Sequence, residues 1–204
     1  MEELTASTIY FKEPGKHNTD RTLELAHERA NALGMSTILV ATTTGYTGVR
    51  AVQKFNGFDV IVVTHSTGSK APNTQELTSD NRKVIEENSG HILTCQHALG
   101  GINRAVRRKL KTYQLDEIIA YTLRIFGEGM KVVVEMALMA ADAGLVRTDR
   151  PVIAIAGTGS GADTAVVLLP VNAQNFFDLK IVEVICRPSP DHTEYTGHRV
   201  VNHK

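Results

Sequence analysis

The chain has 204 residues, with 22 acidic residues against 22 lysines and arginines, and 42% of it is hydrophobic. This length suits one α/β domain with a core of its own. The balanced charge disfavours a protein whose main partner is nucleic acid or an anionic membrane, because such binding draws on a surplus of basic residues. We therefore expect neither nucleic acid nor a membrane as a partner.

The cysteines and the apolar stretches indicate where the protein works. Cys95 and Cys186 are too few for a disulfide framework, and both lie in apolar runs typical of buried strands. No apolar stretch of signal-peptide type begins the chain, and the long apolar segment 132–146 is interrupted by Glu135 and Asp142. These features predict a soluble, cytoplasmic protein.

Short β-branched runs recur along the chain, each followed by a polar, glycine-containing loop and by residues spaced for a helix. This alternation predicts a mostly parallel sheet that helices cover on both faces. We expect strands at residues 7–11, 37–41, 59–64, 91–95, 152–156, 165–169 and 180–187. We expect helices at residues 19–33, 47–55, 79–87, 102–111, 116–126 and 128–143.

Near the end of the chain, only a glycine-rich loop separates the strands expected at 152–156 and 165–169. Since the loop leaves no room for a crossover helix, the second of these strands should be antiparallel to the first. No repeat or linker divides the chain, so we expect one domain over residues 1–188 and a polar tail over 189–204. His192, Glu194 and His198 in this tail have no second cluster to complete a metal site, and none is expected.

The segment TTTGYTG at residues 42–48 lies between a buried strand and the start of a helix. Ligands bind at the carboxyl ends of parallel strands, and a helix N-terminus offers unpaired amides to an anion. The hydroxyls of Thr43, Thr44 and Thr47 add donors, and Gly45 and Gly48 let the backbone approach a ligand. The segment is therefore a candidate phosphate site, and an ordinary turn whose threonines cap the helix remains the alternative.

The segment GTGSGAD at residues 157–163 differs from the dinucleotide-binding fingerprint, because the spacing of its glycines is shorter and a β-branched run follows instead of a helix. It also lacks the Lys and Ser/Thr ending of a P-loop. What remains is a side-chain-poor loop at the end of a strand, able to cover a ligand with its amides. A loose hairpin turn is the alternative.

Three further groups of residues are weaker candidates. His65, Ser66 and Thr67 follow a strand at the same edge of the sheet and could line the pocket, although a surface turn is favoured for them. Cys95 and His97 could form a nucleophile pair, but nothing supplies oxyanion donors or a third group. The basic run 104–111 could grip a phosphate or RNA, but an exposed helix face is favoured, as is a solvated side chain for Lys131.

Several of these segments together resemble a known domain. They are TILVATTTGYTGVRAVQKF, then DVIVVT, and later MALMAADAGLVRTDRPVIAIAGTGSGADTAVVLLPV, and they are similar to the C-terminal domain of pyruvate kinase. With FGEGMKVVVE at residues 126–135, the whole chain resembles a family of stand-alone, chiefly archaeal proteins of this pyruvate kinase C-terminal domain-like fold. The domain of the kinase holds a phosphate of an allosteric sugar bisphosphate in its threonine loop, and the stand-alone family is associated with flavin mononucleotide (FMN).

The resemblance implies a three-layer α/β/α sandwich with core strand order 3-2-1-4-5, the fifth strand antiparallel, and added strands at both ends. It implies that both loops converge on one phosphorylated ligand, FMN as cofactor, and it leaves a homo-oligomer open. The implied contacts are Thr43, Thr44, Gly45, Tyr46, Thr47 and Gly48, with His65, Ser66 and Thr67, and Gly157, Thr158, Gly159, Ser160 and Gly161 as the cover.

The activity is less defined than the fold. The barrel of pyruvate kinase, with its metal and phosphoenolpyruvate sites, has no counterpart here, so pyruvate kinase activity is not expected. An FMN-dependent oxidoreductase and a non-catalytic phosphometabolite sensor both remain open, and no residue is assigned as the catalytic acid or base. A flavin would supply the redox chemistry itself.

Overall fold

The computed structural model describes residue 3 and residues 5–189. The tail predicted for residues 189–204, which includes His192, Glu194 and His198, therefore lies outside the described residues except for Ser189.

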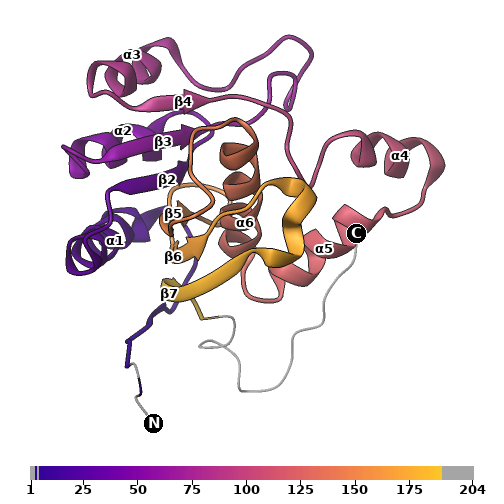
Figure 1. Cartoon of the computed structure of the whole chain (residues 1–204). Coiled ribbons are helices and arrows are strands. Elements are labelled where there is room, and N and C mark those ends of the chain that lie inside the picture. The colour runs from indigo at the N-terminus through magenta and orange to yellow at the C-terminus, as the bar shows by residue number, and fades with distance from the viewer. Residues whose placement is uncertain (1–2, 4, 190–204) are drawn as a thin grey trace.

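Seven strands in the described part of the chain form one sheet in the order β1-β7-β6-β5-β2-β3-β4 (Figure 1). Their bounds are β1 (Ile9–Phe11), β2 (Thr37–Ala41), β3 (Asp59–Val63), β4 (His91–Leu93), β5 (Val152–Ala156), β6 (Thr164–Leu169) and β7 (Lys180–Pro188). β6 runs antiparallel to both of its neighbours, and the other pairs are parallel.

This topology confirms the expected core. Strands β4-β3-β2-β5-β6 reproduce the order 3-2-1-4-5, with the fifth of them antiparallel. The added strands β1 and β7 come from the two ends of the chain, and both join the sheet beyond β6. They extend the side of the sheet that lies away from β2 and β3. The predicted phosphate loop lies at the carboxyl ends of β2 and β3.

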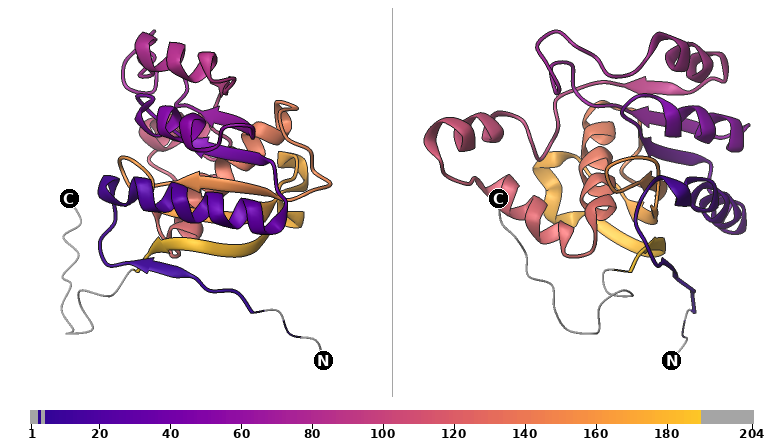
Figure 2. Two further views of the ribbon diagram at one scale, coloured as in Figure 1. Left: turned by 90° about the vertical axis from the view of Figure 1, so that its left-hand side faces the viewer. Right: turned by 180° about the vertical axis from the view of Figure 1, so that it is seen from behind.

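Helices cover the sheet on both faces (Figure 2). They are α1 (Thr19–Leu33), α2 (Tyr46–Lys54), α3 (Ser79–Glu87), α4 (Ile102–Leu110), α5 (Leu115–Arg124) and α6 (Glu128–Asp142), with short 3-10 helices at Lys16–Asn18 and Ala173–Asp178. Side chains of α1, α2 and α3 belong to one hydrophobic cluster, and those of α6 belong to another on the opposite face.

Strand β2 shows why the sheet needs both layers. Ile38 and Val40 pack with α1, α2 and α3, whereas Leu39 points to the opposite face and packs with α6, and all three are 0% exposed. A strand buried on both faces has to be apolar throughout, as the TILVA run is. The three-layer sandwich predicted from the sequence is confirmed.

The chain between β4 and α6 leaves the sheet and forms α4 and α5 (Figure 1). α5 packs against α6, but no residue of α4 is buried. Within the described residues, no helix has the length and the apolar content that crossing a bilayer would require.

Candidate functional site

The turn after β2 combines a helix cap with a set of free donors. The hydroxyl oxygen of Thr42 accepts hydrogen bonds from the amides of Gly45 and Gly48, at 3.1 and 3.4 Å. The amides of Tyr46 and Thr47 lie in the first turn of α2, where the helix itself supplies no acceptor. Thr42 therefore caps the helix, and these two amides can bind an anion. The helix-cap interpretation of the TTTGYTG segment therefore applies to Thr42, and the phosphate site stays a prediction.

Gly45 gives this turn its shape. Its φ is +103°, and a Cβ atom there would lie 2.3 Å from the Cβ of Asn81 at the start of α3. The side-chain amide of Asn81 also donates a hydrogen bond to the carbonyl of Thr44 at 2.9 Å. Helix α3 therefore holds the loop in place, and only glycine fits at position 45.

The glycine-rich loop between β5 and β6 is anchored by Asp163, which is 0% exposed. Its carboxylate accepts hydrogen bonds from the amides of Gly15 and Thr158, at 2.8 and 3.1 Å, and from the hydroxyl of Thr164 at 2.9 Å. The hydroxyl of Thr19, at the start of α1, accepts from the amide of Ala162 at 3.0 Å. The loop is thus fixed at its base, which a loose hairpin turn would not be.

The two loops face one cavity of about 540 Å³ at the carboxyl ends of β2, β3 and β5. Side chains of α6 form the wall opposite the threonines, and Arg104 of α4 and Arg124 of α5 lie at the rim. The lining residues are Ala41, Thr42, Thr43, Thr44, Tyr46, Thr47, Val63, Thr64, His65, Glu76, His97, Arg104, Arg124, Glu128, Lys131, Val132, Glu135, Met136, Met139, Gly157, Gly159, Ser160 and Gly161.

Most of the residues predicted from the sequence meet at this cavity. Those that line it are Thr43, Thr44, Tyr46, Thr47, His65, Gly157, Gly159, Ser160 and Gly161. Gly45 and Gly48 are buried behind the loop instead, Thr67 is exposed elsewhere, and Ser66 lines a neighbouring cavity with His97 and Arg104. Thr158 turns its amide to Asp163. The role of these residues as ligand contacts stays a prediction.

A buried ion pair on α6 was not expected from the sequence. Lys131 and Glu135 are 4% and 3% exposed, and the Nζ of Lys131 lies 2.5 Å from the Oε2 of Glu135. The prediction of a solvated Lys131 is therefore wrong. A lysine in the first turns of an amphipathic helix carries no mark of burial in the sequence, because its burial depends on how α4 and α5 fold over α6.

The surroundings of Glu135 keep its carboxylate ionised. Burial alone would raise the pKa of Glu135, but hydrogen bonds from His97 and the charge of Lys131 outweigh this effect and lower the pKa to about 2. The amide of Leu99 also donates to Oε1 of Glu135 at 3.0 Å. Burial lowers the pKa of Lys131, while Glu135 acts in the opposite direction.

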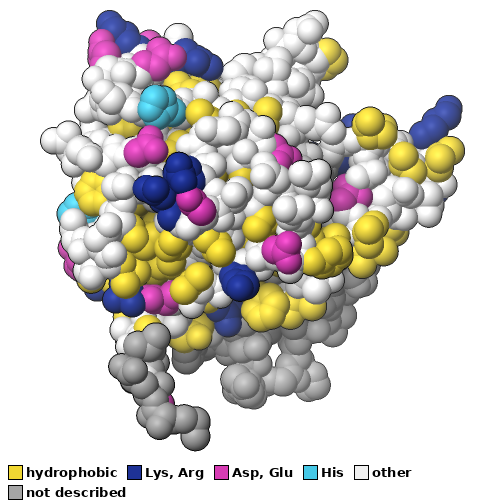
Figure 3. All heavy atoms as spheres, in the orientation of Figure 1, with side chains coloured by type: hydrophobic (Ala, Val, Ile, Leu, Met, Phe, Trp, Pro, Cys, Tyr) yellow, Lys and Arg dark blue, Asp and Glu magenta, His cyan; other side chains and the backbone are white. Residues whose placement is uncertain are grey.

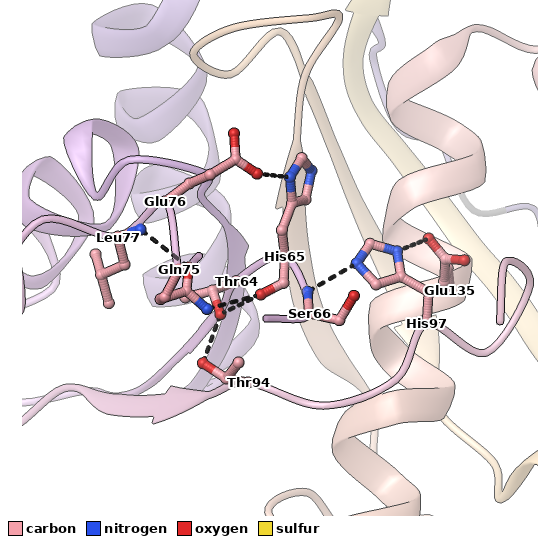
Figure 4. A network of polar contacts seen from close by, with 9 residues as sticks. All are labelled: Thr64, His65, Ser66, Gln75, Glu76, Leu77, Thr94, His97 and Glu135. Atoms are coloured by element: carbon pink, nitrogen blue, oxygen red, sulfur yellow. Dashed lines mark hydrogen bonds and ion pairs between the residues drawn. The ribbon is translucent and has the colours of Figure 1, made fainter. Parts of the chain in front are cut away.

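Two histidines, His97 and His65, lie between Glu135 and Glu76 (Figure 4). The Nδ1 of His97 lies 3.3 Å from Oε2 of Glu135, and its Nε2 accepts from the amide of Ser66 at 3.4 Å. Since Nε2 is an acceptor, Nδ1 carries the proton of a neutral ring and donates it to Glu135. The ring of His65 lies 5.5 Å from that of His97, between centroids.

His65 has a different arrangement. Its Nδ1 lies 2.9 Å from Oε2 of Glu76, and its carbonyl accepts a hydrogen bond from the side chain of Gln75 at 3.0 Å. Among the described residues, nothing bonds to its Nε2, and the ring lines the cavity. An imidazole oriented by a carboxylate in this way can accept a proton from a ligand or donate a hydrogen bond to it.

The structure also bears on the candidate nucleophile pair and on metal sites. His97 contacts Glu135 and Ser66 rather than Cys95, and burial raises the pKa of the Cys95 thiol, so a Cys–His nucleophile pair is not formed. In the described part of the chain, no three histidine, cysteine or acidic side chains come close enough together to hold a metal ion.

Comparison with known proteins gives one match to a family. The family model of the pyruvate kinase alpha/beta domain matches residues 20–168, which include both loops and α6. The structure of Cryptosporidium parvum pyruvate kinase in complex with ADP is similar over 81% of this chain and 23% of its own, with 14% identity and a TM-score of 0.36. An O-ureido-L-serine synthase variant with O-ureido-L-serine bound is similar over 68% and 49%, with 18% identity and a TM-score of 0.31.

This chain spans about a quarter of the length of that pyruvate kinase and half of the synthase. The family match covers residues 20–168, which is most of the chain. The chain belongs to the pyruvate kinase alpha/beta domain family.

Proposed function

We propose that the protein binds a phosphorylated small molecule in the cavity between the threonine loop and the glycine loop. The single observation that carries this proposal is the convergence of both loops, with the first-turn amides of α2, on one cavity of about 540 Å³. The phosphate contacts the hydroxyls of Thr43, Thr44 and Thr47 and the amides of Tyr46 and Thr47, and the glycine loop covers it.

Hydrogen bonds from the threonine loop can supply the free energy needed to bind a phosphate. A hydrogen bond to a charged group contributes roughly 1.5–3 kcal/mol, and micromolar affinity requires about 8 kcal/mol. Three or four donors on one phosphate therefore account for binding of this order, before ordering costs. Three cations also line the cavity, but Arg124 pairs with Glu128 and Lys131 with Glu135, so only Arg104 at the rim adds a favourable potential for an anion.

FMN is our candidate for the ligand. The cavity has the size of ordinary small-molecule sites. Among the described residues that line the cavity, Tyr46 is the only tyrosine, phenylalanine or tryptophan. An isoalloxazine ring would therefore rest mainly on the side chains of Val132, Met136 and Met139. If FMN is bound, it would supply redox chemistry, and His65 is the side chain placed to exchange a proton with the bound molecules.

A sensor of a sugar phosphate or another phosphometabolite is the second candidate. It is supported by the family match, because this domain has a regulatory role in pyruvate kinase. Such a sensor would act through contacts between chains. Exposed hydrophobic side chains over α4 and α5, at the right of Figure 3, offer a surface for a homo-oligomer. A flavoprotein would be yellow when purified, and a sugar-phosphate sensor would be colourless.

Titration of FMN into variants of the threonine loop tests the site. Replacing Thr44 and Thr47 with valine keeps the volume of both side chains and removes two hydroxyl donors. We expect the double variant to lose about 2 kcal/mol or more of binding free energy, because two charged hydrogen bonds are removed. This loss corresponds to an affinity for FMN roughly 30-fold lower, which isothermal titration calorimetry measures. Thr112→Val, at an exposed position between α4 and α5, is the matched control and should bind as the wild type does. Unchanged affinity in the double variant would move the site elsewhere.

A further inference from the structure

Arg104 lies where three cavities meet. It lines the site cavity, a second cavity of about 360 Å³ between α4, α5 and α6, and a third beside residues 66–69. We call the second one the basic cavity. It shares Arg104, Arg124, Glu128 and Lys131 with the site cavity, so the two are continuous at this wall.

The charges of the basic cavity are not balanced. Arg107 pairs with Glu117 at 2.9 Å and Arg124 with Glu128 at 2.8 Å, and Lys131 pairs with Glu135. Within residues 5–189, Arg104 and Arg108 form no ion pair and no side-chain hydrogen bond. Two guanidinium groups thus remain without a counter-charge in a concave surface.

The neighbouring cations also repel one another. Burial lowers the pKa of Lys131 most, Glu135 raises it, and the charges of Arg124 and Arg104 have smaller effects that lower it. Like charges in one cavity destabilise each other unless an anion lies between them. Helix α4 has no acidic residue that could supply this charge, since its sequence is INRAVRRKL. An anion bound from outside the chain would supply this charge.

We propose that Arg104, with Arg108 and Arg124, forms a second anion subsite, which binds the phosphate group of a second small molecule beside the ligand held by the threonine loop. One guanidinium group can donate two parallel hydrogen bonds to a phosphate. Arg104 and Arg108 are four residues apart on α4, so they lie on the same face of this helix. The inference rests on the proposed function, because it assigns a co-substrate or an effector to the free end of the same cavity.

The test is calorimetric titration of inorganic pyrophosphate into the full chain at low salt. Wild type should bind two pyrophosphates per chain, and one when FMN occupies the threonine loop. Arg104→Gln should retain the threonine-loop site and lose at least ten-fold in affinity at the other. Lys83→Gln on α3, which removes one positive charge outside the three cavities, should behave as wild type.

The outcomes separate the two proposals. If Arg104→Gln keeps both sites, or if the wild type binds one pyrophosphate that depends on Thr44 and Thr47 alone, the second subsite is overturned and the proposed function stands. If Thr44→Val with Thr47→Val keeps both sites while Arg104→Gln loses one, the proposed function is overturned instead. Absence of any binding contradicts both. Circular dichroism should show the same folded structure for Arg104→Gln, since Arg104 has no partner within the described chain.

Discussion

Lys131 and Glu135 show how much of the site depends on single residues. Both are buried on α6, and their charges are compensated by each other, by His97 and by the amide of Leu99. A buried ion pair is seldom a net source of stability, but the loss of one partner leaves the other charge buried and alone. The pair therefore fixes the wall of the cavity, and its integrity can be tested through stability.

Glu135→Gln should lower the free energy of unfolding by about 3 kcal/mol, because the ammonium group of Lys131 would lose its counter-charge. Urea denaturation followed by circular dichroism measures this change. Glu86→Gln, which removes an exposed carboxylate of α3 that pairs with Arg82, is the control and should change stability by less than about 1 kcal/mol. An equal effect of the two substitutions would contradict the buried pair.

The same pair predicts a pH dependence. The pKa of Glu135 is lowered from its ordinary value of 4.5 to about 2 in the folded protein. A lowered carboxyl pKa stabilises the fold above the unfolded-state value, and this stabilisation is lost as pH falls through the folded-state value. The stability difference between wild type and Glu135→Gln should thus be full above pH 4.5 and shrink toward pH 2. A difference that stays constant down to pH 2 would contradict the lowered pKa.

At the scale of elements, the sequence predicts what depends on short-range pattern. Strands β2 and β5 and helix α3 occupy the expected ranges, because apolar runs and polar or glycine boundaries define them locally. The positions of the threonine loop and the glycine loop in the chain are predictable from the sequence for the same reason. The approach of Arg104, His97 and Lys131 to the cavity is not predictable in this way, since it depends on how α6 packs on the face of the sheet and how the chain between β4 and α6 is placed beside it.

The glycine loop is the element whose rigidity matters most for binding. Asp163→Ala would leave the amides of Gly15 and Thr158 without their shared acceptor, so the loop should open more often. We expect faster amide hydrogen exchange at residues 157–161 and FMN affinity at least about ten-fold lower, equivalent to about 1.4 kcal/mol. Asp149→Ala, in an exposed turn where Asp149 contacts Arg147 and Arg150, is the control. Unchanged exchange would show that Asp163 does not anchor the loop.

At the scale of the whole molecule, the sheet order places the two loops together. Since β5 pairs with β2 in parallel, the loops that follow Ala41 and Ala156 both begin at the carboxyl ends of adjacent strands, although more than a hundred residues separate them in the sequence. The balance of charge in the whole chain also holds at the cavity, where Arg104, Arg124 and Lys131 are matched by Glu76, Glu128 and Glu135, and the threonines are neutral. Composition could exclude a generally basic protein but could not reveal this cavity.

A comparison of FMN with riboflavin tests the central claim most directly, because the two differ only in the phosphate. Calorimetric titration of wild type should give an affinity for FMN at least about 100-fold higher than for riboflavin, since two charged hydrogen bonds contribute roughly 3 kcal/mol or more. Equal affinity for the two, or no binding of FMN at all, would contradict a phosphate site that holds FMN at the start of α2.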